Sequence, residues 1–171
     1  MAPRERPAVR QKRMTKPGDL RFEPADPART DLLMELMREF YACEHLDFDE
    51  RLARRALDEL LGSPSLGRVI LAVANEEVAG YLILGFGFSL EFHGRDAFLD
   101  EIYLREAYRG RGIGKAALEF VEAACRREGI HALHLEVDRA NERAQAVYRQ
   151  AGYRDHDRYL LTKRLGRPDD G

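Results

Sequence analysis

Three closely spaced glycines, Gly110, Gly112 and Gly114, stand where an apolar strand pattern gives way to a helical one. Before them, residues 97–104 form a short, mostly apolar run of the kind expected for a strand. After them, apolar residues recur with the 3.6-residue period of an amphipathic helix, and one face carries Ile113, Ala117, Phe120, Val121, Ala124 and Cys125. The pattern predicts a strand, a tight turn and a helix in succession, which is typical of α/β proteins.

The rest of the chain extends this pattern on both sides. Further strands are predicted over residues 20–23, 69–73, 78–89, 131–137 and 159–163, and further helices over 30–41, 50–61 and 141–152. The order is β-α-α-β-β-β-α-β-α-β, an α/β fold with a mixed, twisted sheet flanked by helices. We expect a single domain over residues 19–168, within the ordinary domain size for a chain of 171 residues.

Charge and composition argue against a nucleic-acid-binding, membrane-spanning or secreted protein. Residues 1–16 carry six basic side chains and one acidic one, interleaved with prolines, so residues 1–18 are expected to be a disordered basic tail. The rest of the chain is acidic, which argues against a nucleic-acid partner; binding of RNA or a membrane surface through the tail alone is a weaker alternative. No apolar run is long enough for a membrane span, and the N-terminus lacks the apolar core of a secretory signal. A cytoplasmic protein is expected.

The glycine-rich turn has the properties of an anion-binding site. A helix that begins directly after glycines exposes unpaired backbone N–H groups at the positive end of its dipole, and Arg109, Arg111 and Lys115 add charge. A nucleoside-triphosphate loop would need Ser or Thr after the lysine, where the chain has Ala116. The dinucleotide fingerprint G-x-G-x-x-G is also absent, because the run reads G-x-G-x-G. A glycine-rich helix start with solvated arginines remains the alternative.

Two motifs in this half of the chain resemble those of the GNAT superfamily of N-acetyltransferases. Arg109-x-x-Gly112-x-Gly114 is similar to the family's pyrophosphate motif, and Asn141-x-x-Ala144-x-x-x-Tyr148, followed by Gly152-Tyr153, is similar to its second signature. The resemblance covers roughly residues 20–165. It implies the GNAT fold, with splayed fourth and fifth strands, and transfer of an acetyl group from acetyl-CoA to a primary amine by direct attack in a ternary complex. No metal is implied.

The resemblance also assigns residues to acetyl-CoA. The backbone of the fourth strand would bind the pantetheine arm, the glycine turn would bind the pyrophosphate, and Asn141 and Ala144 would border the arm. Asn141 could equally be a helix N-cap. The residues implied in cofactor binding are Ile102, Tyr103, Leu104, Arg109, Gly110, Arg111, Gly112, Ile113, Gly114, Lys115, Asn141, Ala144 and Tyr148.

Acyl transfer from a thioester to an amine requires a proton acceptor for the amine and a proton donor for the departing thiolate. Tyr148 matches the family's general acid. Asp100 and Glu101 are the candidate bases; neighbouring strand residues face opposite sides unless a bulge intervenes, so one of the two is expected to face the amine. Second-rank candidates for the amine pocket are Tyr41, Glu44, His45 and His93.

The identity of the amine is less constrained. Residues 89–101 resemble the GNAT branch that acetylates polyamines and thialysine, although Leu90-Glu91 and the order of the acidic pair Asp100-Glu101 depart from it. A small-molecule amine is favoured, a protein amine is possible, and so is a homodimer. Cys125 lies on the apolar helix face and is expected to be buried rather than to carry the acyl group. The alternative function is a non-catalytic acyl-CoA sensor, which would need neither Tyr148 nor the acidic pair.

Overall fold

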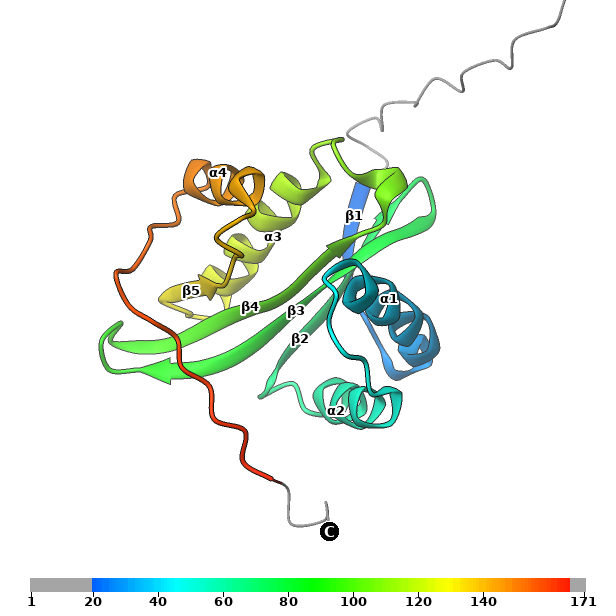
Figure 1. The fold of residues 1–171 in the computed structure, drawn as a ribbon, viewed down its shortest axis with the longest axis horizontal. Helices are drawn as coiled ribbons and strands as arrows, with labels where there is room; N and C mark the ends of the chain where they lie inside the picture. The colour runs from blue at the N-terminus through cyan, green and yellow to red at the C-terminus, as the bar shows by residue number, and fades with distance from the viewer. Residues whose placement is uncertain (1–19, 167–171) are drawn as a thin grey trace, which may run out of the picture.

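The structure, a computed structural model, describes residues 20–166. The basic segment 1–18 and the outermost residues of the expected domain lie outside the described range. The elements follow the predicted order up to the last strand (Figure 1). They are β1 Leu20–Pro24, α1 Thr30–Cys43, α2 Glu50–Gly62, β2 Gly67–Ala74, β3 Glu77–Ser89, β4 Gly94–Leu104, α3 Ile113–Arg127, β5 Ala132–Leu135 and α4 Glu142–Gln150, with short 3₁₀ turns at Pro27–Arg29 (η2) and Glu106–Tyr108 (η3).

The five strands form one sheet in the order β1-β2-β3-β4-β5. β1 to β4 are antiparallel neighbours: short turns join β2 to β3 and β3 to β4, whereas α1 and α2 lie between β1 and β2. β5 follows the crossover helix α3 and is parallel to β4. The expected mixed sheet is therefore confirmed.

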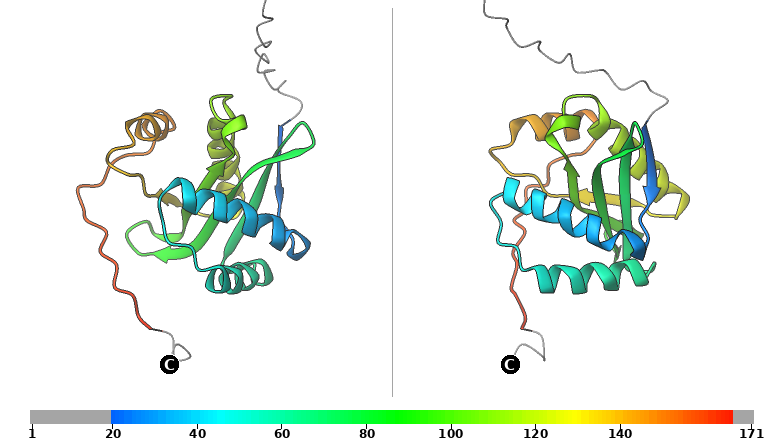
Figure 2. Two further views of the ribbon diagram at one scale, coloured as in Figure 1. Left: turned by 45° about the vertical axis from the view of Figure 1, so that its right-hand side comes forward. Right: turned by 90° about the vertical axis from the view of Figure 1, so that its right-hand side faces the viewer.

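Helices cover both faces of this sheet, as Figure 2 shows. On one face α1 and α2 bury their apolar stripes against alternate residues of β2 and β3, such as Leu71 and Tyr81. On the other face α3 packs through its predicted stripe against Leu82 and Leu84. Cys125 belongs to that second cluster and is 4% exposed, so its expected burial is confirmed.

A bulge interrupts β4 in the middle. Ile83 of β3 is paired with Glu101, and the next residue, Leu84, is paired with Leu99, so Asp100 has no partner on β3. An extra residue changes which side of the sheet the following side chains face. Accordingly Leu99 packs in the α3 cluster, whereas Tyr103 packs in the α1 cluster.

The fourth and fifth strands separate as expected. Pairing between β4 and β5 runs from Asp96 opposite Ala132 to Leu99 opposite Leu135 and then stops. β4 continues for five more residues, bonded to β3 on one side only. Its other edge, from Asp100 to Leu104, has no neighbouring strand within residues 20–166, which leaves backbone groups for another extended partner.

The last predicted strand, at residues 159–163, is wrong. The structure assigns no strand after α4 in the described chain; the chain leaves the helix through Gly152 and passes across the β3–β4 hairpin as coil (Figure 1). Tyr159 and Leu161 alternate as in a strand, yet they are 82% and 88% exposed. Alternation gives a strand only where the segment pairs with a neighbouring strand, and this segment pairs with none within the described chain.

None of the helices between residues 20 and 166 combines the length and the apolar character needed to cross a membrane.

Candidate active site

The glycine turn places the start of α3 beside the unpaired edge of β4. Gly110 and Gly112 have φ angles of +72° and +82°, a left-handed conformation that glycine adopts without strain. Gly112 is the N-cap residue, and no side chain of residues 20–166 caps the helix. The first N–H groups of α3 are therefore available for an anion at the positive end of the helix dipole.

The two arginines of the glycine turn, Arg109 and Arg111, contact different parts of the protein. The guanidinium of Arg109 donates to the carbonyl oxygen of Leu104 at 2.7 Å, lies over the Tyr103 ring and contacts the sulfur of Cys43 at 3.6 Å. Its charge is thus held at the end of β4. Arg111 stacks on Tyr108, and its Nε is buried without a hydrogen-bond partner among the described residues. An unpaired buried donor beside an uncapped helix start is suited to a phosphate oxygen.

Helix α4 carries the second motif. The Asn141 side chain accepts a hydrogen bond from the backbone N–H of Ala144 at 3.0 Å, so Asn141 is the N-cap of this helix. Its predicted contact with pantetheine remains a prediction, as does that of Ala144. Lys115 is exposed and lies 3.8 Å from Glu119, so it adds charge near the turn without being fixed there.

The acidic pair and two tyrosines form a cluster between β3, β4 and α1. Glu101 is 7% exposed, and its carboxylate accepts a hydrogen bond of 2.6 Å from the phenol of Tyr81, which is fully buried. The phenol of Tyr41, from α1, interacts with the same carboxylate. Asp100, at the bulge, is open to solvent and close enough to Tyr41 to act on its ionisation. The bulge therefore brings both acids near Tyr41, where strict alternation would have separated them.

Burial raises the pKa values of three titratable groups in this cluster, Glu101, Asp100 and Tyr41. It raises the pKa of the Glu101 carboxyl, although hydrogen bonds from Tyr81 and Tyr41 oppose the rise. Partial exclusion of water at the bulge raises the pKa of the Asp100 carboxyl as well. Burial and the neighbouring Glu101 raise the pKa of Tyr41 to about 12, so this phenol keeps its proton. Carboxyls with raised pKa values can accept a proton closer to neutral pH than ordinary surface carboxyls can.

Tyr148 lies on the other side of β4. Its ring packs edge-on against Tyr153, with 5.9 Å between the ring centroids, and both belong to the α3 cluster. Burial, with a contribution from Glu44 at the end of α1, raises the pKa of Tyr148. The phenol is therefore protonated at neutral pH, as a proton donor must be.

Sequence reasoning did not include Tyr81 in the site. Tyr81 could have been found from the sequence, because it places a single hydroxyl within the buried apolar run of β3, where a polar atom needs a hydrogen-bond partner. Of the second-rank candidates, Tyr41 joins the acidic cluster. Tyr41 and His45 also line a hollow of about 390 Å³ at the α1–α2 loop, whereas His93 lies in the β3–β4 turn.

The model of the acetyltransferase (GNAT) family matches residues 30–153, most of the described chain. The chain belongs to the GNAT family. It is an acetyl-CoA-dependent acyltransferase, as its family and its N-acetyltransferase relatives indicate.

Relatives of this GNAT protein agree with that assignment. It is 30% identical over 132 residues to the thialysine N-epsilon-acetyltransferase of Bos taurus, covering 72% of this chain and 77% of the relative. It is 37% identical to the uncharacterized N-acetyltransferase YycN of Bacillus subtilis (strain 168), over only 42% of this chain and 45% of that protein.

Solved structures share the fold. An integron cassette protein from the mobile metagenome of Cole Harbour Salt Marsh superposes with a TM-score of 0.76 at 35% identity, over 86% of this chain and 91% of that one. A predicted acetyltransferase from Clostridium acetobutylicum, solved with acetyl-CoA, superposes with a TM-score of 0.71 at 18% identity, over 84% of this chain and 96% of that one. Within residues 20–166 of this GNAT domain, no group of three or more His, Cys, Asp or Glu residues is arranged to hold a metal ion.

The glycine turn can be tested with a pair of matched valine substitutions. Gly112 and Gly129 flank α3, both have positive φ, and no heavy atom of the described residues lies within 4 Å of a Cβ added at either position. Both variants should lose about 1–3 kcal/mol of stability through backbone strain. Only Gly112→Val should raise the Kd for acetyl-CoA, by about tenfold or more, or roughly 1.4 kcal/mol, because its side chain faces the anion site. Equal affinities of the two variants in calorimetry would remove the turn from the site.

The cluster around Glu101 predicts a pH effect. Tyr81→Phe removes a hydrogen bond that stabilises the ionised carboxylate, so the pKa of Glu101 should rise further. The acid limb of kcat/KM should then move to higher pH, and unfolding should be easier by about 1–3 kcal/mol. Tyr108→Phe is the control, because that phenol bonds Glu77 instead. An unmoved acid limb in Tyr81→Phe would show that Glu101 does not titrate in the reaction.

Proposed function

We propose that this GNAT protein transfers the acetyl group of acetyl-CoA to a primary amine, by direct attack while both substrates are bound. The observation that carries the proposal is the position of the acidic pair. Asp100 and Glu101 begin the stretch of β4 that β5 leaves unpaired, and the uncapped start of α3 follows the end of that stretch. A proton acceptor, an edge for an extended chain and an anion site thus follow one another along the same part of the protein.

The residues present fit acetyl-CoA. The open edge of Ile102 to Leu104 can bond the pantetheine amides as a neighbouring strand would, and the N–H groups from Arg109 to Lys115 can hold the pyrophosphate. Arg111 offers its unpaired Nε. When bound, acetyl-CoA supplies the activated acetyl thioester. Asn141 and Ala144 border the arm in this proposal, on the strength of the shared motif.

The two acids have different roles in the proposal. About 0.04% of an ordinary alkyl amine is unprotonated at pH 7, so the site must both hold the ammonium and take its proton. Asp100 reaches solvent and can attract the cation. Glu101, buried and held by two phenols, has the tuned pKa of a proton acceptor.

Tyr148 serves as the proton donor. Its phenol oxygen gives its proton to the sulfur of the departing thiolate, and its raised pKa keeps that proton in place beforehand. Its half-buried ring is fixed by Tyr153, which limits the orientations of the hydroxyl.

A small amine is the favoured acceptor. The relatives from Bos taurus, Mus musculus and Sus scrofa are thialysine N-epsilon-acetyltransferases, and thialysine carries a primary amine. The α1–α2 loop adds negative charge, although Asp49 caps α2 and Glu50 pairs with Arg38 at 3.1 Å. Glu44 and Asp47 are exposed carboxylates of that loop and can attract a cation.

Separate Asp100→Asn and Glu101→Gln variants test this division. Both should keep the Kd for acetyl-CoA. Against a panel of small amines and peptide amines, Asp100→Asn should mainly raise the KM for the amine. Glu101→Gln should lower kcat/KM by about 10²-fold or more and flatten its acid limb, because the proton acceptor is lost. Normal kcat/KM in both would overturn the acidic pair as the base.

Binding of acetyl-CoA without turnover of any amine by the unmodified protein would favour an acyl-CoA sensor.

Tyr148→Phe tests the proton donor, with Tyr153→Phe as its control. The Tyr153 hydroxyl is buried without a hydrogen-bond partner in the described chain, so removing it should leave kcat and stability nearly unchanged. Tyr148→Phe keeps the ring packing but should lower kcat by about 10²- to 10⁴-fold, or roughly 3–5 kcal/mol of barrier, without raising the KM for acetyl-CoA. The loss should shrink with a more acidic leaving thiol. Near-normal kcat would reduce Tyr148 to a packing residue.

A further inference from the structure

One face of α1 carries Glu35, Glu39 and Cys43 at four-residue intervals, so their side chains form a row along the helix. The row lies against the short connection between β4 and the glycine turn. Glu35 and Glu39 pair with Arg105, just after β4, at 2.6 and 2.9 Å. At the end of α1, the sulfur of Cys43 contacts the guanidinium of Arg109 at 3.6 Å. The C-terminal half of α1 is therefore joined to both ends of this connection.

The two arginines of the connection differ in what balances their charge. Arg105 is paired with two carboxylates, whereas Arg109 pairs with none among residues 20–166. The Arg109 guanidinium instead donates to the carbonyl oxygen of Leu104 and lies 5.5 Å from the centroid of the Tyr103 ring. Leu104 in turn borders the first turn of α3, since its Cδ1 lies 4.0 Å from a Cβ added at Gly114. A positive charge without a carboxylate partner in the described chain is thus held close to the uncapped helix start, where an anion can bind.

Glu39 fixes the ring over which Arg109 lies. Besides its bonds to Arg105, the Glu39 carboxylate accepts a hydrogen bond of 3.1 Å from the phenol of Tyr103. Burial alone would raise the pKa of the Glu39 carboxyl, but the hydrogen bonds from Arg105 and Tyr103 outweigh burial and hold the pKa below its usual value. Glu39 is therefore ionised at neutral pH. Tyr103 is 8% exposed and also packs against Phe40, so its ring is held both at the hydroxyl and along its side.

We propose that Glu39 is a positioning residue for acetyl-CoA: by fixing Tyr103, it holds the guanidinium of Arg109 where it meets the pyrophosphate. This role rests on the proposed binding of the pyrophosphate by the glycine turn. The charge of Glu39 has the opposite effect, because a carboxylate near the site repels an anion. Removal of Glu39 should therefore weaken the binding of acetyl-CoA if Glu39 positions Arg109, and strengthen it if only the charge matters.

Matched alanine variants of Glu39 and Glu35 decide between these effects. Both remove a carboxylate from the same face of α1 and a partner of Arg105, but only Glu39 bonds Tyr103. In calorimetry, Glu39→Ala should raise the Kd for acetyl-CoA about fivefold or more, whereas Glu35→Ala should leave it unchanged or lower it slightly. Glu39→Gln, whose amide oxygen can accept the same hydrogen bonds, should recover part of the affinity.

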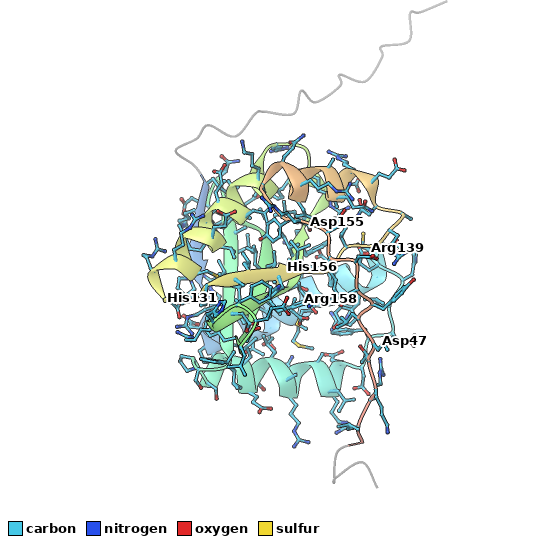
Figure 3. All side chains as sticks on the ribbon, turned by 90° about the vertical axis from the view of Figure 1, so that its left-hand side faces the viewer. Asp47, His131, Arg139, Asp155, His156 and Arg158 are labelled. Carbon is cyan, nitrogen blue, oxygen red and sulfur yellow. The ribbon has the colours of Figure 1, made fainter. Side chains whose placement is uncertain are left out.

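Two further variants separate positioning from loss of an ion pair. Tyr103→Phe removes the same hydrogen bond from the other side while keeping the ring beside Arg109, so it should also raise the Kd for acetyl-CoA. Arg158, labelled in Figure 3 on the segment after α4, pairs with Glu91 of the β3–β4 turn at 2.8 and 3.1 Å. Glu91→Ala removes this exposed pair and should leave the Kd unchanged. An unchanged or lowered Kd in both Glu39→Ala and Tyr103→Phe overturns the positioning role.

A double-mutant cycle with Arg109→Gln tests the route from Glu39 to the ligand. If Glu39 acts through Arg109, adding Glu39→Ala to Arg109→Gln should raise the Kd no further. Two parts of the CoA molecule serve as separate probes. In Glu39→Ala, 3′-phospho-ADP, which has the pyrophosphate but no arm, should lose affinity as acetyl-CoA does, whereas pantetheine, which has the arm alone, should not.

The outcomes separate the positioning role from the site on which it rests. A full effect of Glu39→Ala in the Arg109→Gln background, or a loss of pantetheine affinity, would mean that Glu39 supports the edge of β4 and would overturn the role. A raised Kd in Arg109→Gln with a normal Kd in Glu39→Ala also overturns that role alone. A normal Kd in Arg109→Gln overturns the role together with the proposed contribution of Arg109 to pyrophosphate binding.

Discussion

Asp100 adds one residue to β4 without a partner on β3, and this bulge decides where the acidic pair faces. Before it, Ala97 and Leu99 pack on the α3 side of the sheet; after it, Glu101 faces Tyr81, on the α1 side. In unbroken alternation Glu101 would share the face of Leu99 and bring a carboxylate into the apolar cluster beneath α3, on the opposite side of the sheet from the phenols of Tyr81 and Tyr41. Burying an unpaired charge there would cost several kcal/mol. The extra residue thus converts an unfavourable position into a hydrogen-bonded one.

The same residue marks the point where the sheet opens. Pairing of β4 with β5 ends at Leu99 and Leu135, one residue before the bulge. A bulge increases the local twist of its strand and bends it, so the far half of β4 diverges from the direction of β5. β3 follows β4 through the bend because their pairing resumes at Glu101 and continues to Leu104. One local irregularity therefore accounts for both the placement of the acids and the free strand edge beside them.

Much of this fold could be predicted because it depends on local patterns. The stripe of α3, the glycines with positive φ and the Asn141 cap each follow from a few neighbouring residues. The bulge could not be predicted, because it depends on the register of β4 against β3, where Glu101 faces Ile83 and Leu99 faces Leu84, residues well apart in sequence. The contact of Arg109 with Leu104 and Cys43 likewise depends on where α1 ends in space. The strand predicted at residues 159–163 failed for the same reason: its alternation is local, whereas its pairing partner is not.

The two groups assigned to proton transfer lie in different hydrophobic clusters. Glu101 is held on the α1 side of β4 by Tyr81, and Tyr148 packs on the α3 side with Tyr153. Burial raises both pKa values, with opposite consequences: the carboxyl becomes a better proton acceptor near neutral pH, and the phenol becomes more certain to be protonated. Since β4 separates the clusters, a bound molecule can approach both only past the edge that β5 leaves open. Glu44, at the end of α1, adds to the effect of burial on the pKa of Tyr148, so a carboxylate from the α1 side acts on the phenol across β4. The proposed reaction therefore depends on the divergence of β4 from β5 as much as on the acid and base themselves.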